Sequence, residues 1–313
     1  MDRPFLTFTV RPEDDGRTLA GLLRTRYGMS RGLIRRLKKP GCALADGEEI
    51  PMTGRVRAGQ VIALYLPAEA QSRVRPEPQP LAIVYEDRDL LVVEKPAGVL
   101  VHPSGVDRGG TLVNGVAHYL ISRGEPSAAG PVTRLDRDTS GLVLFAKHPH
   151  AHHRLCVALA AGKVQRRYLA LAEGDVQPDE GVIEAPIRRA PGALTRRAVL
   201  PGGQPARTYY RVLGRYNAAP VGLAGRFSLL ELTLQTGRTH QIRVHLAHIG
   251  HPLLGDAMYG RALPGRLERQ ALHAHSLAFP HPRDGRPLTL ASDLPDDLRA
   301  LLADAPEQTP HRA

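Results

Sequence analysis

Apolar residues recur at helical spacing near the N-terminus of this 313-residue chain. One amphipathic helix is predicted to end at Gly28, because glycine suits a helix C-cap. A second is expected to begin at Ser30, a preferred N-cap residue. Short strands are expected at 42–50 and 60–67, so the pattern predicts a small α+β module. The apolar face of the first helix comprises Leu19, Leu22 and Leu23.

After residue 80 the pattern changes to short apolar runs with the composition of strands. Helices are expected after Thr111, at 149–162, after Thr239 and at 293–303. Several strands follow one another without a helix between them, which favours an α+β domain on a mainly antiparallel mixed sheet over a doubly wound fold. The expected strands are two within 81–98, then 141–147, 165–174, 181–187, 206–216, 227–237, 273–282 and 286–292.

A stretch rich in proline and polar residues divides the chain at 67–80. It lacks apolar periodicity, which is typical of a linker. We therefore expect a small domain at 1–66, a main domain at 81–305 and a polar tail at 306–313.

The charge balance is strongly basic, with 42 Lys and Arg against 31 Asp and Glu and a net charge of +11. Such an excess favours a polyanionic partner, most simply nucleic acid, over a merely solvated basic face. Five cations cluster on the helix expected at 30–39, where they suit phosphate contacts or, equally, a charged solvent face. These cations are Arg31, Arg35, Arg36, Lys38 and Lys39.

Cysteine content and apolar runs point to a cytoplasmic protein. The two cysteines, Cys42 and Cys156, form neither a disulfide framework nor a zinc-binding spacing. The N-terminus does not resemble a signal peptide, and no apolar run approaches the length of a membrane span. We therefore expect no membrane association.

Cofactor motifs are lacking. The chain has no P-loop and no GxGxxG motif, so nothing calls for ATP or a nicotinamide cofactor. The histidines of HPHAHH, residues 148–153, have no acidic or cysteine cluster beside them and open a helix. We therefore expect neither a metal nor a cofactor.

Two charged stretches directly adjoin predicted strands: TRLDRDTSG at 133–141 and QTGRTHQIRVH at 235–245. Arg243 falls in the first turns of a helix, a favourable place to meet a carboxylate such as Asp136. A fixed guanidinium would keep that carboxylate ionised and able to act as a nucleophile or base. From the residues alone, a structural ion pair is an equal alternative.

Four motifs in order resemble the RluA-type family of RNA pseudouridine synthases. RLDRDTSGLVLFAK, at 134–147, is similar to the family's signature, and LLVVEKPAGVLVHP, at 90–103, to its entry motif. QRRYLAL at 165–171 and LQTGRTHQIRVHLAHIGHPLLGD at 234–256 match two further elements. The N-terminal module resembles the RNA-binding domain shared with small-subunit ribosomal protein S-four.

The resemblance implies the pseudouridine synthase fold and an isomerase that converts uridine in RNA to pseudouridine without a cofactor. Asp136 would be the catalytic carboxylate and Arg243 its partner, while Tyr168 would stack on the base. Arg134 would replace the flipped uridine in the RNA. Arg238 and His240, in the family's Gly-Arg-x-His motif, would assist base flipping and RNA contact. The implied substrate is large-subunit ribosomal RNA, with transfer RNA as a second class, and a monomer is expected.

Two departures from the family pattern concern substrate choice. Thr133 stands where the family has histidine, and Arg166 where it has lysine. One alternative is an RNA-binding ribosome-assembly factor of the same fold that has lost catalysis. Another is an unrelated metal-dependent hydrolase that uses Asp136 and Asp138.

Overall fold

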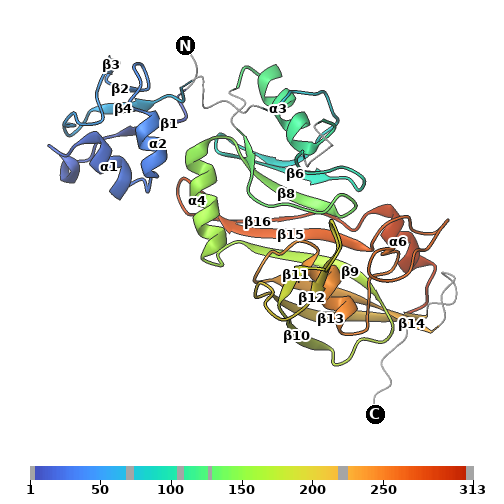
Figure 1. The fold of residues 1–313 in the computed structure, drawn as a ribbon. Coiled ribbons are helices and arrows are strands. Elements are labelled where there is room, and N and C mark those ends of the chain that lie inside the picture. The colour runs from blue at the N-terminus through green and yellow to red at the C-terminus, as the bar shows by residue number, and fades with distance from the viewer. Residues whose placement is uncertain (1–3, 68–73, 104–108, 126–128, 218–224, 308–313) are drawn as a thin grey trace.

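The computed structural model describes residues 4–67, 74–103, 109–125, 129–217 and 225–307 (Figure 1). Most of the predicted linker's first half, 68–73, and most of the predicted tail, 308–313, lie outside the described residues. Within the described part of the chain, no helix is long and apolar enough to cross a membrane.

Residues 4–67 form the N-terminal module, which has its own four-stranded sheet in the order β1-β4-β2-β3 (Figure 1, blue). Two short helices pack on it, and the apolar residues of helices and strands share one core. This agrees with the α+β module that the pattern predicts. The elements are β1 (Leu6–Thr9), η1 (Pro12–Asp14), α1 (Leu19–Thr25), α2 (Arg31–Arg36), β2 (Ala43–Ala45), β3 (Glu48–Glu49) and β4 (Val61–Leu64).

Both helices of the module end earlier than predicted. α1 ends at Thr25, and Gly28 then adopts a φ of 60° while the Met29 N–H returns to an earlier carbonyl of the helix. α2 begins after Ser30, whose side chain accepts the N–H of Leu33, as expected of an N-cap. It ends at Arg36, so two of its five predicted cations follow the helix in a turn. All five cations are exposed.

The large domain, residues 74–307, is built on a ten-stranded mixed sheet. Its main path runs β10-β13-β14-β9-β15-β8-β6-β5, with β16 beside β15 and β7 beside β8. β15 and β8 are parallel, and the other strand pairs of this sheet are antiparallel. The mixed α+β architecture agrees with the prediction.

The elements of the large domain are β5 (Ala82–Glu86), β6 (Leu90–Lys95), α3 (Leu112–Ser122), β7 (Gly130–Pro131), β8 (Ser140–Ala146), α4 (Pro149–Ala160), β9 (Gln165–Glu173), β10 (Glu180–Glu184), β11 (Ile187–Arg189), β12 (Arg197–Val199), β13 (Arg207–Asn217), β14 (Arg226–Leu234), α5 (Gln241–His248), β15 (Leu272–Pro280), β16 (Pro287–Ala291) and α6 (Asp296–Ala303). β11 and β12 form a separate two-stranded hairpin.

Strands β6 and β8 are buried on both faces, which explains their nearly unbroken apolar sequences. One set of alternate residues, including Val93 and Phe145, packs in the core that contains α3. The other set, including Val92 and Leu144, packs against α4. The sheet is therefore rigid where β8 begins, directly after Asp136 and its neighbours.

The described part of the predicted linker lies against the large domain. Val74 packs on the core that contains α3, and the N–H of Glu77 donates to the carbonyl of Asn114 at 3.1 Å. The amide of Asn114 in turn donates to the carbonyl of Arg75 at 2.8 Å. Residues 74–77 are thus held against the large domain by contacts that apolar periodicity does not reveal.

Candidate active site

The segment before β8, residues 133–139, carries Asp136 and is called the Asp136 loop below. Gly141 lets this loop approach β15, because its φ is 112° and a Cβ there would lie 2.3 Å from the Ala274 carbonyl oxygen. From the chain before β15, the Gln270 amide donates to the Thr139 hydroxyl at 3.0 Å. The β8–β15 pairing therefore fixes one side of the loop.

Lys95, at the end of β6, bonds the backbone of the Asp136 loop. Its ammonium group is fully buried and donates to the carbonyls of Pro96, Val99 and Arg137, at 2.8, 2.7 and 2.7 Å. Burial lowers the pKa of Lys95 to about 7. The bond to Arg137 ties the residue next to Asp136 to the end of β6.

Arg243, on α5, is held by a buried carboxylate that the sequence analysis did not single out. Its Nε and Nη2 donate to the two carboxylate oxygens of Asp256 at 2.7 and 2.8 Å. Its guanidinium also lies 5.0 Å from the ring centre of Tyr259. Burial acts to lower the pKa of Arg243, but the bonds to Asp256 outweigh it and raise that pKa. Arg243 is therefore a fixed cation.

The predicted contact between Arg243 and Asp136 is present. Arg243 Nη1 lies 3.4 Å from Asp136 Oδ2, longer than its bonds to Asp256. The side chain of Asp136 is 22% exposed, against 8% for Arg243. Asp136 is thus an accessible carboxylate beside a buried guanidinium, an arrangement suited to a nucleophile or base.

His240 lies near the same carboxylate oxygen as Arg243, with its Nε2 3.9 Å from Asp136 Oδ2. It is the N-cap of α5, with a φ of 59°, so the prediction of Thr239 as the cap is wrong by one residue. Its Nδ1 is bonded to the Tyr259 hydroxyl at 2.8 Å, which holds the ring at this turn. Burial lowers the pKa of His240, so the imidazole is neutral at pH 7.

Tyr168, on β9, lines the same cleft and is 7% exposed. Burial raises the pKa of its hydroxyl, which therefore stays protonated at neutral pH. The neighbouring Arg166 donates to the carbonyls of Leu234 and Thr236, at 3.3 and 3.4 Å, and so covers the turn before α5. Arg166, which stands where the family has lysine, thus lines the cleft.

Thr133, Arg134 and Arg238 complete the set of residues that the sequence singles out near Asp136. The Thr133 hydroxyl accepts the N–H of Leu144 at 3.0 Å and so joins the loop to β8. Arg134 is exposed at the cleft. Arg238 is half-buried, and its Nε donates to the Pro205 carbonyl at 3.1 Å.

These residues line one cleft of about 240 Å³, large enough for a nucleobase. Its walls combine apolar side chains with cationic ones, and Asp136 is the carboxylate among its lining residues. A larger hollow of about 710 Å³ lies between the N-terminal module and the large domain and contains none of the predicted catalytic residues. The 240 Å³ cleft is lined by Arg134, Asp136, Arg166, Tyr168, Leu234, Arg238, His240, Ile242, Arg243 and Leu272, among others.

Three residues that shape the site were missed from the sequence: Lys95, Asp256 and Tyr259. Lys95 and Asp256 lie inside the quoted motifs, but nothing in their spacing reveals which groups they contact. Tyr259 lies three residues after Asp256, whose carboxylate also accepts its backbone N–H at 3.2 Å.

The family model described as RNA pseudouridylate synthase matches residues 89–248. The chain is 46% identical over 231 residues to ribosomal large subunit pseudouridine synthase D of Nitrosomonas europaea; the match covers 71% of this chain and 64%, less than two thirds, of that relative. It is 38% identical over 296 residues to an uncharacterised RNA pseudouridine synthase of Bacillus subtilis, covering 95% of this chain and 96% of the relative.

A solved structure of human RNA pseudouridylate synthase domain containing 1 has a TM-score of 0.58 and 29% identity. It covers 74% of this chain and 92% of its own chain. The sequence motifs, the family match and the shared fold agree. The chain belongs to the RNA pseudouridylate synthase family.

Proposed function

We propose that this chain isomerises uridines in structured RNA to pseudouridine, with Asp136 as the catalytic carboxylate. The observation that carries the proposal is the position of Asp136: partly accessible, in a cationic cleft, beside the fixed guanidinium of Arg243. The reaction breaks the bond between N1 and C1′ and forms one between C5 and C1′. N1 gains a proton and C5 loses one, so the reaction is redox-neutral.

The side chains around Asp136 suit a flipped nucleotide. Tyr168 offers a neutral aromatic ring, because burial raises the pKa of its hydroxyl, and this ring is a stacking surface for the base. Arg134 is exposed, as a side chain that enters the RNA in place of the base must be. Arg238 and His240, at the start of α5, contact the flipped nucleotide or its phosphates in this proposal.

We propose large-subunit ribosomal RNA as the substrate, in keeping with the name of the Nitrosomonas europaea relative, with transfer RNA as the alternative. The N-terminal module would bind RNA through Arg31, Arg35, Arg36, Lys38 and Lys39, all exposed. One chain contains all the proposed catalytic residues, so we expect a monomer, acting in the cytoplasm where this RNA resides.

Tritium release from RNA that contains C5-tritiated uridine tests the reaction, because forming the C5–C1′ bond expels the hydrogen at C5. Release that depends on Asp136 supports a synthase, whereas RNA binding without release would indicate a non-catalytic assembly factor. Release that stops in EDTA would favour metal-dependent chemistry. Mapping pseudouridines in ribosomal and transfer RNA of a strain that lacks the protein then identifies the target.

A further inference from the structure

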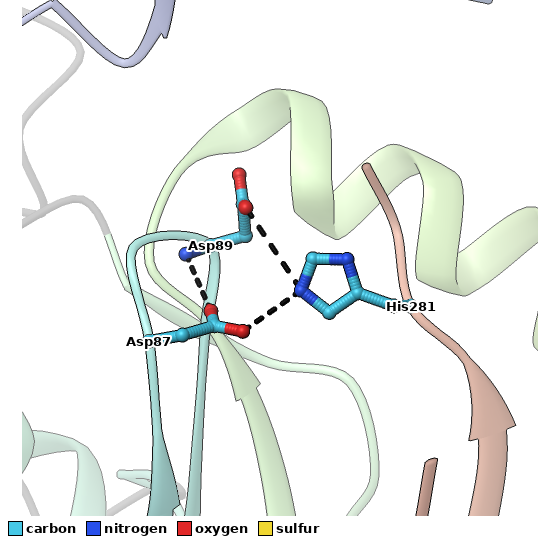
Figure 2. A group of neighbouring side chains, drawn as sticks. All are labelled: Asp87, Asp89 and His281. Atoms are coloured by element: carbon cyan, nitrogen blue, oxygen red, sulfur yellow. Dashed lines mark hydrogen bonds and ion pairs between the residues drawn. The ribbon is translucent and has the colours of Figure 1, made fainter. Parts of the chain in front are cut away.

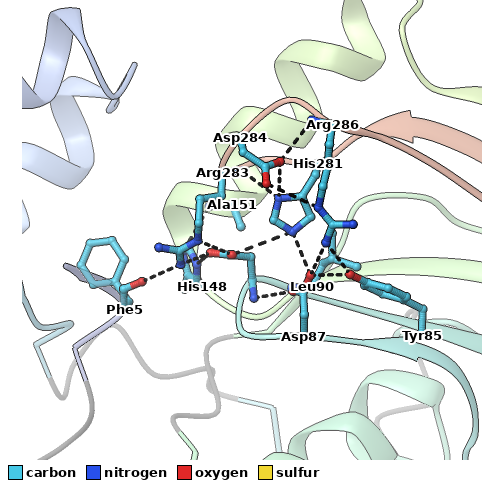
Figure 3. Close-up of polar contacts among 11 residues, drawn as sticks. Phe5, Tyr85, Asp87, Leu90, His148, Ala151, His281, Arg283, Asp284 and Arg286 are labelled. Atoms are coloured by element: carbon cyan, nitrogen blue, oxygen red, sulfur yellow. Dashed lines mark hydrogen bonds and ion pairs between the residues drawn. The ribbon is translucent and has the colours of Figure 1, made fainter. Parts of the chain in front are cut away.

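The N-terminal module contacts the large domain through its first described residues (Figure 3). Arg283 donates to the carbonyl of Phe5 at 3.4 Å, and Arg88 donates to the carbonyl of Pro4. The ring of Phe5 lies 5.2 Å from that of His148. Phe5 also belongs to the core of the module and is 6% exposed. The large domain therefore contacts a well-packed part of the module.

A second contact lies at the turn after α1. The side chain of Arg154, on α4, approaches Gly28 so closely that a Cβ at Gly28 would lie 3.0 Å from Arg154 Nη1. Figure 1 shows the module beside α4, in agreement with this contact. One contact point would leave the module free to rotate, whereas two separate points restrict its orientation.

The large domain presents Arg283 in an already ordered position. Two nitrogens of its guanidinium bond Asp89 at 2.7 and 2.6 Å, and His148 bonds the same carboxylate at 2.9 Å. His148 Nδ1 accepts the N–H of Ala151, so its Nε2 carries the hydrogen that faces Asp89. Burial acts to raise the pKa of Asp89, but the bonds from His148 and Arg283 outweigh it and lower that pKa. Little side-chain freedom remains to be lost when Arg283 meets the module.

Asp87, Asp89 and His281 lie close enough together to suggest a metal site (Figure 2). The carboxylate of Asp87 already accepts two backbone N–H groups and bonds His281 at 2.8 Å. Arg283 and His148 bond both oxygens of Asp89. Because each carboxylate oxygen has a donor and a guanidinium lies alongside, the geometry favours an ion-pair network over a cation site.

We propose that this network, the Asp89 cluster, is a docking site for the chain's own N-terminal module. Arg88 and Arg283 donate to the consecutive carbonyls of Pro4 and Phe5, just before β1, and the ring of Phe5 packs beside that of His148. Docking holds the module at a fixed distance and orientation from the cleft. Its effect on RNA, though not the docking itself, rests on the proposed function.

Electron paramagnetic resonance on the full chain tests the docking directly. Nitroxide labels at the exposed residues Glu48 and Asp296 report the distance between module and large domain, after Cys42 and Cys156 are replaced by alanine. We expect one narrow distance distribution without RNA. A broad distribution in this labelled protein, in which Arg88 and Arg283 are intact, would overturn the proposal.

The double variant Arg88→Gln/Arg283→Gln removes both donors to the module and should broaden the distribution. The matched control is Arg286→Gln, on the same loop as Arg283, because Arg286 bonds Tyr85 and Asp284. It should keep the narrow distribution. Equal distributions in all three proteins would contradict the proposal, and thermal unfolding curves establish that each variant is folded.

The consequence for RNA is measured separately. On a long ribosomal RNA fragment the double variant should show a KM raised by roughly threefold or more at nearly unchanged kcat, because a mobile module presents a lower effective concentration to its part of the RNA. A short hairpin should show no difference. If the double variant and the unaltered protein had equal KM values on the long fragment as well as on the hairpin, this alignment role would be contradicted. The resonance measurement needs no RNA, so it distinguishes failed docking from a failure of the proposed function.

Discussion

Replacing Asp256 by asparagine tests whether the buried carboxylate positions Arg243. The asparagine oxygen can stand in for Oδ1, which accepts Arg243 Nη2 and the N–H groups of Met258 and Tyr259. Its amide nitrogen then faces Arg243 Nε, which loses an acceptor now at 2.7 Å. The variant therefore keeps the shape of the site and removes one charged hydrogen bond.

The structure sets the expected size of the effect. A hydrogen bond to a charged group contributes about 1.5–3 kcal/mol, and removal of one partner of a buried ion pair costs about 3–5 kcal/mol. Since Asp256→Asn keeps one of the two hydrogen bonds to Arg243 and both bonds to backbone N–H groups, we expect the free energy of unfolding to fall by about 3 kcal/mol. Arg243 would then be less well fixed beside Asp136, and we expect kcat to fall about 10- to 100-fold, or about 1.4–2.7 kcal/mol. RNA affinity should not change, because Asp256 is buried.

Urea unfolding gives the stability, and single-turnover tritium release gives the rate. Glu184→Gln is the control, because Glu184 forms an exposed ion pair with Arg207 and its loss should change stability by less than about 1 kcal/mol. The positioning role of Asp256 is refuted if Asp256→Asn resembles this control in both measurements.

Three further changes have defined outcomes. Asp136→Asn should abolish tritium release while filter binding shows unchanged RNA affinity; normal turnover would exclude Asp136 as the catalytic group. Because the pKa of Lys95 falls from 10.5 to about 7 on folding, the unfolded chain binds more protons there between these pH values, and stability attributable to Lys95 rises with pH. Lys95→Met should remove that rise in urea unfolding at pH 7 and 9.5, and an equal slope in both proteins would contradict it. Gly141→Ala should lower the free energy of unfolding by about 3 kcal/mol or more, measured by thermal unfolding, because its Cβ would clash with Ala274. Gly192→Ala is the control, with a φ of 70° and open space around its Cβ, and should lower it by less. Equal losses would point to backbone strain alone.

Local sequence signals predicted the elements that depend on neighbouring residues. Ser30 and Thr111 cap their helices as expected, because a cap bonds backbone groups two or three residues away. The strands β1, β7 and β12 were missed, since two to four residues carry too little periodicity. Thr239 failed as a cap because the next residue, His240, is anchored to Tyr259 in a left-handed conformation.

The site was predictable only in part. The sequence pattern pairs Asp136 with Arg243, since both stand in charged stretches that adjoin strands. Lys95 looks like an ordinary lysine at a strand end, but its bond to Arg137 bridges 42 residues, which no local pattern reveals. Asp256 ends a quoted motif, yet its partner depends on how the chain turns after α5. Long-range polar contacts of this kind arise from the tertiary fold.

The parallel pairing of β8 with β15 has a consequence for the nascent chain. Asp136 and Arg243 are 107 residues apart, and Thr139 is 131 residues from the Gln270 amide that holds it. During synthesis, the Asp136 loop therefore emerges long before the strand that fixes it. Activity can appear only after β15 has left the ribosome and joined the sheet, so truncated chains that end before residue 272 should bind RNA without modifying it.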